Sequence, residues 1–262
     1  MRSLTIDELD IEDEDSFSHV GLYADLKQVL RAGGYRFQIL PPGPGARWDR
    51  AVMLSRTYWG AADGSEILVE PSIPADVVAH AAWHHLAARE LAPPGAPLGA
   101  DALFFGEALA SAFDVFLVGR LLGHSPDSSF LGTQVPAMAD AAQAAGVSEA
   151  AFNAMLVEIA ADPDRAFEDL RSLLFDATTA LVACAGVAQA FDALAAFDKH
   201  RFGCLLHHYE LADWVLFARA YAADALGPDP RVRAVDEELR NQRVPLDWLT
   251  TAWVEPAMKA PT

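Results

Sequence analysis

The stretch that decides the fold is Val77-Val78-Ala79-His80-Ala81-Ala82-Trp83-His84-His85-Leu86-Ala87, followed downstream by Phe105-Gly106-Glu107-Ala108-Leu109. His80 and His84 are four residues apart, so an α-helix places both on one face with their Cβ atoms about 6 Å apart. The carboxylate of Glu107, on a second helix, completes a set of three metal ligands. Catalytic zinc sites use three protein ligands and leave the fourth position to water. The sequence therefore predicts a zinc site at His80, His84 and Glu107.

The second helix of this predicted site covers residues 103–122 and is apolar on most of its faces. Its polar exceptions, Glu107, Ser111 and Asp114, follow one another at i, i+4 and i+7 and therefore form one stripe. A carboxylate buried in such a helix is costly unless it is paired or bound to a metal, which favours Glu107 as a ligand. Asp114 is expected to accept a hydrogen bond from the other ring nitrogen of a ligand histidine. The plain alternative is a stripe that faces solvent or pairs with Arg120.

This pattern resembles the glutamate-type zincin metallopeptidases, whose motif is HExxH with a third-ligand glutamate on the next helix. Here the motif reads His80-Ala81-Ala82-Trp83-His84 and then Gly106-Glu107-Ala108, and the match covers residues 66–122. The resemblance implies a zincin-like fold, a bound zinc ion and the hydrolysis of peptide bonds in a peptide or protein substrate.

Two positions depart from the family pattern. Ala81 occupies the position of the general-base glutamate, and the frequent aspartate four residues after the third ligand is replaced by Ser111. Loss of a general base costs about 10²–10⁴ in rate. We therefore expect a chain that binds metal but is nearly inactive as a peptidase. Ala81 is either an engineered replacement of the glutamate or the natural residue of a pseudopeptidase that binds a metal or a peptide. A third alternative is that the two histidines have another role.

A second polar cluster lies at residues 206–213, in a stretch that is expected to be helical. If the chain is a zincin, His207, His208 or Tyr209 is a candidate to stabilise the oxyanion. A different class would join His207 and Glu210 to the three predicted ligands in a di-iron carboxylate oxygenase, with iron in place of zinc. That class favours Glu-x-x-His, and the order is reversed here. An ordinary polar helix face is the plainest interpretation of the cluster.

Composition limits the class of protein. The 262 residues are 52% hydrophobic, which supports a large core, and the formal net charge is −18. Such an acidic chain argues against binding to nucleic acids or to anionic membranes. Cys184 and Cys204 have no CxxC partner, and the first residues show no signal peptide. A reduced, cytoplasmic setting is therefore expected.

The periodicity of the chain predicts an α+β fold, with a small N-terminal antiparallel sheet followed by a mostly helical body. Residues 1–16 are expected to form an acidic tail, residues 17–125 the sheet with the metal-site helices, and residues 126–262 a helical part packed as one unit with the preceding part. Strands are expected at 35–40, 49–59 and 66–70, with a turn at 62–65, and the first helices at 19–32 and 76–91.

Overall fold

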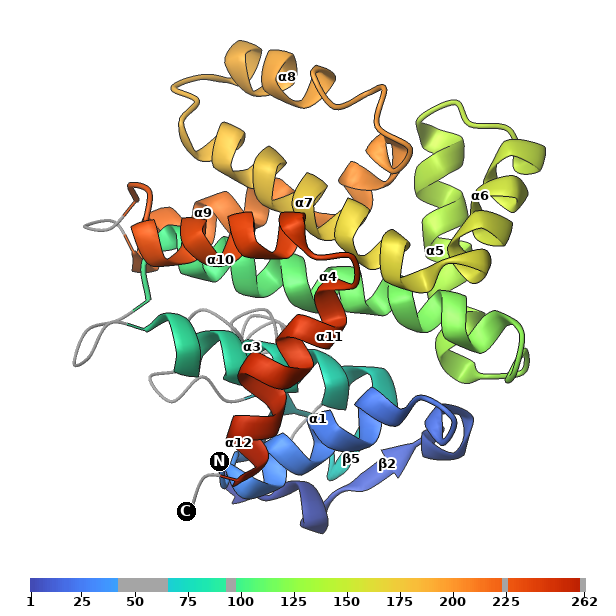
Figure 1. Ribbon diagram of the computed structural model, residues 1–262, viewed down its shortest axis with the longest axis vertical. Coiled ribbons are helices and arrows are strands. Elements are labelled where there is room, and N and C mark those ends of the chain that lie inside the picture. Colours follow the sequence, from blue (N-terminus) through green and yellow to red (C-terminus); the bar gives the residue numbers. More distant parts are fainter. Residues whose placement is uncertain (42–65, 93–97, 223–225, 260–262) are drawn as a thin grey trace.

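The computed structural model is mostly helical, with a few short strands near the N-terminus (Figure 1). The predicted α+β class is therefore confirmed. The expected strand at 49–59 and the turn at 62–65 lie outside the part of the chain that the structure describes. The described residues are 1–41, 66–92, 98–222 and 226–259.

The helices pack around one central helix. In chain order, the helices of the described residues are α1 (Gly21–Ala32), α3 (Ala75–Leu91), α4 (Ala100–Leu122), α5 (Ser129–Ala144), α6 (Glu149–Ala161), α7 (Pro163–Val182), α8 (Val187–Ala195), α9 (Leu211–Tyr221), α10 (Pro230–Asn241), α11 (Pro245–Leu249) and α12 (Glu255–Lys259). The central one is α4, which contacts α7 along one side and α3 along the other, while α1 packs against α3 (Figure 1).

Shorter turns of helix complete this set. Two are 3₁₀ segments near the N-terminus, one is a longer 3₁₀ segment before α9, and one is a π-helical turn between α11 and α12. They are η1 (Ile6–Glu8), η2 (Glu14–Phe17), η3 (Gly203–Tyr209) and η5 (Thr250–Val254).

Helix α4 is buried on nearly all of its faces, which explains its uniformly apolar sequence. Among the described residues, it is the one helix whose length and composition would allow it to cross a membrane. However, 89% of its most apolar window is buried inside the protein. Helix α4 therefore packs as the core helix of the described structure.

The strands form two small sheets in the described part of the chain. In the first, β3 lies between β1 and β4, antiparallel to β1 and parallel to β4; in the second, β2 and β5 are parallel. The prediction of an antiparallel sheet is therefore right for the β1–β3 pair and wrong for the other two pairs. Local patterns give the positions of strands but not their partners, which here are distant in sequence. The strands are β1 (Arg2–Leu4), β2 (Asp10–Glu12), β3 (Phe37–Ile39), β4 (Ile67–Leu68) and β5 (Ser72–Pro74).

Residues 1–16 were expected to form an acidic tail, and this prediction is wrong. They contain β1, η1, β2 and most of η2, and the side chains of Leu4 and Ile6 are buried in the core. Leu4 and Ile6 alternate with the less buried Ser3, Thr5 and Asp7, so the segment packs through one set of side chains and remains solvated through the other. The prediction of a tail rested on the number of acidic residues and did not consider this alternation.

Several of the acidic side chains in this segment also have partners on the helices. The Asp7 carboxylate forms an ion pair with Arg31 of α1 at 2.6 Å. The Asp13 carboxylate accepts hydrogen bonds from the Ser128 hydroxyl at 2.6 Å and from the Ser129 backbone N–H at 2.8 Å. Asp13 thus caps the N-terminus of α5 from a remote part of the chain.

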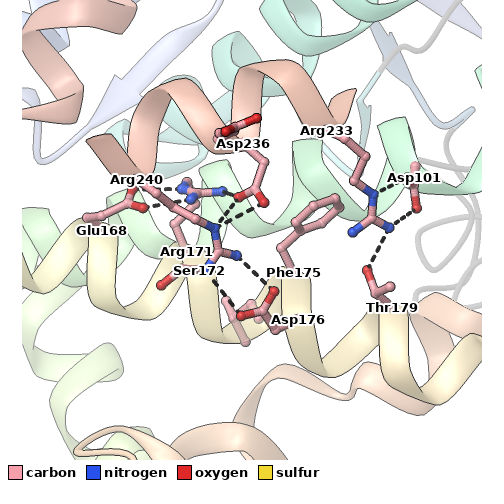
Figure 2. A network of polar contacts seen from close by, with 12 residues as sticks. Asp101, Glu168, Arg171, Ser172, Phe175, Asp176, Thr179, Arg233, Asp236 and Arg240 are labelled. Atoms are coloured by element: carbon pink, nitrogen blue, oxygen red, sulfur yellow. Dashed lines mark hydrogen bonds and ion pairs between the residues drawn. The ribbon is translucent and has the colours of Figure 1, made fainter. Parts of the chain in front are cut away.

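A network of arginines and carboxylates joins α10 to α7 and α4 (Figure 2). The fully buried Arg171 of α7 donates to Glu168 of the same helix at 2.6 Å and to Asp236 of α10 at 2.8 Å. Arg233 of α10 donates to Asp101, in the first turn of α4, at 2.7 Å. This network holds the C-terminal helices on the core.

Candidate metal centre

Helix α3 places the two predicted histidine ligands on one face. It begins after Pro74 and ends at Leu91, close to the predicted bounds. The imidazole rings of His80 and His84 lie with their centroids 5.0 Å apart. Trp83, three residues after His80, packs edge-on against Phe113 of α4 with ring centroids 5.5 Å apart, so it helps to hold α3 on α4.

A close approach of α3 and α4 brings Glu107 to the histidines. A Cβ atom on Gly106 would lie 3.3 Å from the Ala87 Cβ atom and 3.7 Å from the His84 Nδ1 atom. Two small residues thus allow the helices to touch at this point. Directly after Gly106, the Glu107 Oε2 atom lies 3.6 Å from His84 Nε2.

The three predicted ligands are therefore brought together. One donor atom from each of His80, His84 and Glu107 lies within 4.8 Å of the other two, and the group is largely buried. A tetrahedral zinc ion with bonds of about 2.0–2.1 Å places its ligand atoms about 3.4 Å apart. The distance of 3.6 Å between His84 Nε2 and Glu107 Oε2 matches this value. Small side-chain rotations would bring the donor atom of His80 to a similar distance. This group could hold a metal ion.

Asp114 occupies the supporting position that the sequence predicts for it. Its Oδ2 atom lies 3.3 Å from His80 Nδ1, which leaves Nε2 of that ring as the ligand atom. Burial opposes protonation of His80, but the charge and hydrogen bond of Asp114 outweigh it and raise the pKa of His80 to about 9. Burial lowers the pKa of His84 well below its ordinary value, and the charge of His80 adds to this effect.

The centre is rich in carboxylates and poor in permanent cations. Burial raises the pKa of Glu107 to about 7, with the charge of Asp114 adding to the shift and that of His80 opposing it. Burial and the charge of Asp114 also raise the pKa of Asp76, in the first turn of α3, to about 6. Among the described residues, no lysine or arginine forms an ion pair with Glu107 or Asp114. A bound cation would stabilise the charged form of all three carboxylates.

A cavity of about 470 Å³ lies in front of the predicted ligands His80 and Glu107. Its opposite wall comes from η3 and α9 and includes His208 and Tyr209 of the second polar cluster. Tyr209 is only 8% exposed, and its hydroxyl has no hydrogen-bond partner among the described residues. His208 Nε2 lies 3.3 Å from the side-chain nitrogen of Gln134. The structure thus brings two of the three oxyanion candidates to the metal centre.

The third candidate, His207, lies elsewhere. It is exposed and lines a neighbouring cavity below α8. Residues 203–209 form a 3₁₀ helix and not the expected α-helix, so consecutive side chains point in directions that an α-helical wheel does not predict. His207 and Glu210, which a di-iron site requires, are not part of the group of potential ligands formed by the described residues.

Ala81 is fully buried and lies about 100° around α3 from His80. The position of the missing base therefore holds only a methyl group. Two other carboxylates near the centre escaped the sequence reasoning. Asp76 precedes His80 by four residues, a spacing that could have revealed it, whereas Glu66 is buried just before β4 and adds to the electrostatic stabilisation of protonated His80.

Comparisons with models of protein families, with curated proteins and with solved structures found no match. The chemistry of this centre is therefore argued from its geometry. Two imidazole nitrogens, one carboxylate oxygen, a carboxylate behind one ligand and a cavity in front are the parts of a metal site that is open on one side.

Proposed function

We propose that His80, His84 and Glu107 bind one zinc ion and that the protein is a zincin-like metallopeptidase whose hydrolytic step is slowed by Ala81. The observation that carries this proposal is the cluster of three donor atoms within 4.8 Å at one wall of the cavity. Buried Glu107 lacks a lysine or arginine partner among the described residues, and a divalent cation would provide its missing counter-charge.

The donor set favours zinc. Two histidines and one glutamate form a common ligand set of catalytic zinc, and zinc bound there would polarise the carbonyl of a bound amide and acidify water. The same three donors also suit iron(II), so the identity of the metal is a matter for measurement.

The remaining side chains of the cavity define how a peptide would be held. The buried Tyr209 hydroxyl can donate a hydrogen bond to a carbonyl oxygen, and the His208 ring stands beside it. Asp114 keeps the His80 ring in place through Nδ1. Ala81 can neither accept a proton from water nor pass one to a leaving amine. The chain as it stands thus binds a peptide bond better than it cleaves one, and a non-catalytic pseudopeptidase is the second candidate function.

Elemental analysis of the protein, purified without added metal, tests the metal site. We expect about one zinc per chain, lost in His84→Ala and retained in His207→Ala, which removes an exposed histidine outside the group. Two irons per chain would replace this proposal with the di-iron oxygenase. No metal, even after zinc is offered, would overturn it.

The variant Ala81→Glu tests the peptidase chemistry. We expect peptide hydrolysis to rise by about 10²–10⁴ without any change in zinc content. Cleavage of a broad peptide library, followed by mass spectrometry, provides the measurement, and Ala81→Gln is the matched variant with no base. If zinc is bound and Ala81→Glu stays inert, the pseudopeptidase becomes the better proposal.

A further inference from the structure

An apolar space below α8 adjoins the cavity in front of His80 and Glu107, which we call the metal cavity. Two hollows of about 450 and 290 Å³ lie between the end of α7, α8, η3 and α9. We call them together the apolar groove. The two hollows are neighbours, and four side chains line both of them, namely Leu181, Val187, Ala190 and Ala212.

Helix α8 forms the outer wall of this groove and contains no buried residue. It lies at the edge of the molecule (Figure 1) and leaves Val187 and Phe191 exposed by 74% and 67%. On α9, Leu216 is exposed by 64%. Contiguous apolar side chains of this kind on a soluble protein indicate a surface that binds something.

Three residues line both the groove and the metal cavity. Asp213 and Leu216 line both the metal cavity and the larger hollow, and Glu210 lines both the metal cavity and the smaller one. Glu210 has a φ of 50°, a left-handed backbone conformation that is unusual for a residue with a side chain. Both carboxylates are exposed, and neither has a lysine or arginine partner among the described residues. Arg219, at the far end, is engaged with the backbone carbonyls of residues 182 and 184.

A separate observation also points to a ligand in the metal cavity. The Tyr209 hydroxyl is buried without a hydrogen-bond partner among the described residues, although buried hydroxyls are nearly always paired. Burial raises the pKa of Tyr209, and the charge of Asp114 adds to this shift, so the phenol keeps its proton and can donate a hydrogen bond. A carbonyl oxygen in the cavity would satisfy it.

We propose that the metal cavity and the apolar groove form one extended site for a peptide in which lysine or arginine stands next to a large apolar residue. The cationic side chain lies between Glu210 and Asp213, and the apolar side chain enters the groove below α8. A backbone carbonyl oxygen of the peptide accepts a hydrogen bond from the Tyr209 hydroxyl. This assignment rests on the proposed function, because it takes the peptide as the substrate that passes the metal.

Three fluorescein-labelled octapeptides test the assignment by fluorescence anisotropy. They are identical except for a central pair, which is Lys-Leu, Gln-Leu or Lys-Ser. We expect Lys-Leu to bind best, with Gln-Leu about fivefold weaker and Lys-Ser about tenfold weaker. Equal affinity for Lys-Leu and Gln-Leu would overturn the proposal.

Variants separate the local carboxylates from the general acidity of the chain. The double variant Glu210→Gln/Asp213→Asn should remove the preference for Lys-Leu over Gln-Leu and leave the affinity for Gln-Leu unchanged. The matched control Glu149→Gln/Glu237→Gln removes the same net charge from exposed positions on α6 and α10 and should retain the preference. If the control loses as much preference as the double variant, long-range attraction explains the effect and the assigned site is wrong.

Two further measurements on the same samples keep the alternatives apart. Light scattering reports whether a second copy covers α8; a dimer that excludes the Lys-Leu peptide would overturn the proposal. Metal analysis distinguishes the two levels of inference. A Glu210-dependent preference in protein that takes up no zinc supports the peptide site and overturns the zinc peptidase. Bound zinc without any preference among the peptides supports the zinc site and overturns the assigned peptide site.

Discussion

The arginine network and the metal centre bury carboxylates in opposite ways. In the network, Asp236 meets Arg171 at 2.8 Å and Asp101 meets Arg233 at 2.7 Å (Figure 2). In the metal centre, the nearest basic partner of Glu107 among the described residues is a histidine nitrogen at 3.6 Å. Both regions contact α4, so the same helix carries a carboxylate with a permanent counter-charge and another without one.

Buried charges that belong to the fold have a permanent partner within the chain. A guanidinium is charged at every ordinary pH, so the network is complete as soon as the chain folds. The two histidines beside Glu107 are charged only when protonated, and burial raises the pKa of Glu107 to about 7. Glu107 therefore has no permanent counter-charge among the described residues, and a proton or a metal ion would neutralise it.

Breaking the network is expected to have the largest effect. Arg171→Leu removes a fully buried guanidinium and leaves Glu168 and Asp236 with fewer partners. The free energy of unfolding should fall by about 3–5 kcal/mol, measured by urea denaturation. Arg165→Leu, which removes the 71% exposed partner of Asp169, should change it by less than about 1 kcal/mol. Equal effects of the two variants would mean that the network does not stabilise the fold.

Zinc is expected to stabilise the folded protein only through the metal centre. At a free concentration of about 100 times its Kd, zinc is expected to raise the free energy of unfolding by about 2.7 kcal/mol, because it binds the folded state. The increase should vanish in His84→Ala and persist in Arg165→Leu. Thermal unfolding with and without zinc provides the measurement. An unchanged increase in His84→Ala would place the zinc elsewhere.

Asp114→Asn tests the support behind the metal ligands. The carboxylate that fixes His80 Nδ1 would be replaced by an amide, and zinc affinity should fall by about 10–100-fold. Competition with a chromophoric chelator measures the affinity. Asp140→Asn, on the exposed face of α5, is the control. Similar affinities for the two variants would show that Asp114 does not orient the ring.

The smallest effect is expected where a carboxylate is held by hydroxyl and amide groups. Burial opposes ionisation of Asp13, but hydrogen bonds from Ser128, Ser16 and Ser129 outweigh it and lower its pKa below 3.8. Its stabilisation is thus present above the unfolded-state pKa and lost as pH falls through the lower folded-state value. Asp13→Asn should cost about 1 kcal/mol at pH 7 and less near pH 3. Denaturation at both pH values, with Asp15→Asn as the control, tests this; a pH-independent loss would contradict it.

The candidate site was predictable where its residues share a helix. The spacing of His80 and His84, and the stripe of Glu107, Ser111 and Asp114, follow from 3.6 residues per turn, and the structure has both on the faces expected. His207 was misplaced because it lies in a 3₁₀ helix, where an α-helical wheel does not apply. From the sequence, His208 and Tyr209 could be identified as part of a polar cluster, but their position opposite His80 could not be predicted.

By itself, the sequence determined the helices that carry the predicted ligands and the apolar face of each, because these depend on local periodicity. Tertiary structure decided the parallel pairing of β2 with β5, the docking of Asp13 onto α5 and the position of Tyr209 opposite His80. Each of these contacts joins residues far apart in the chain, and their free energy arises from packing and hydrogen bonding between elements. A local sequence pattern therefore cannot identify these partners.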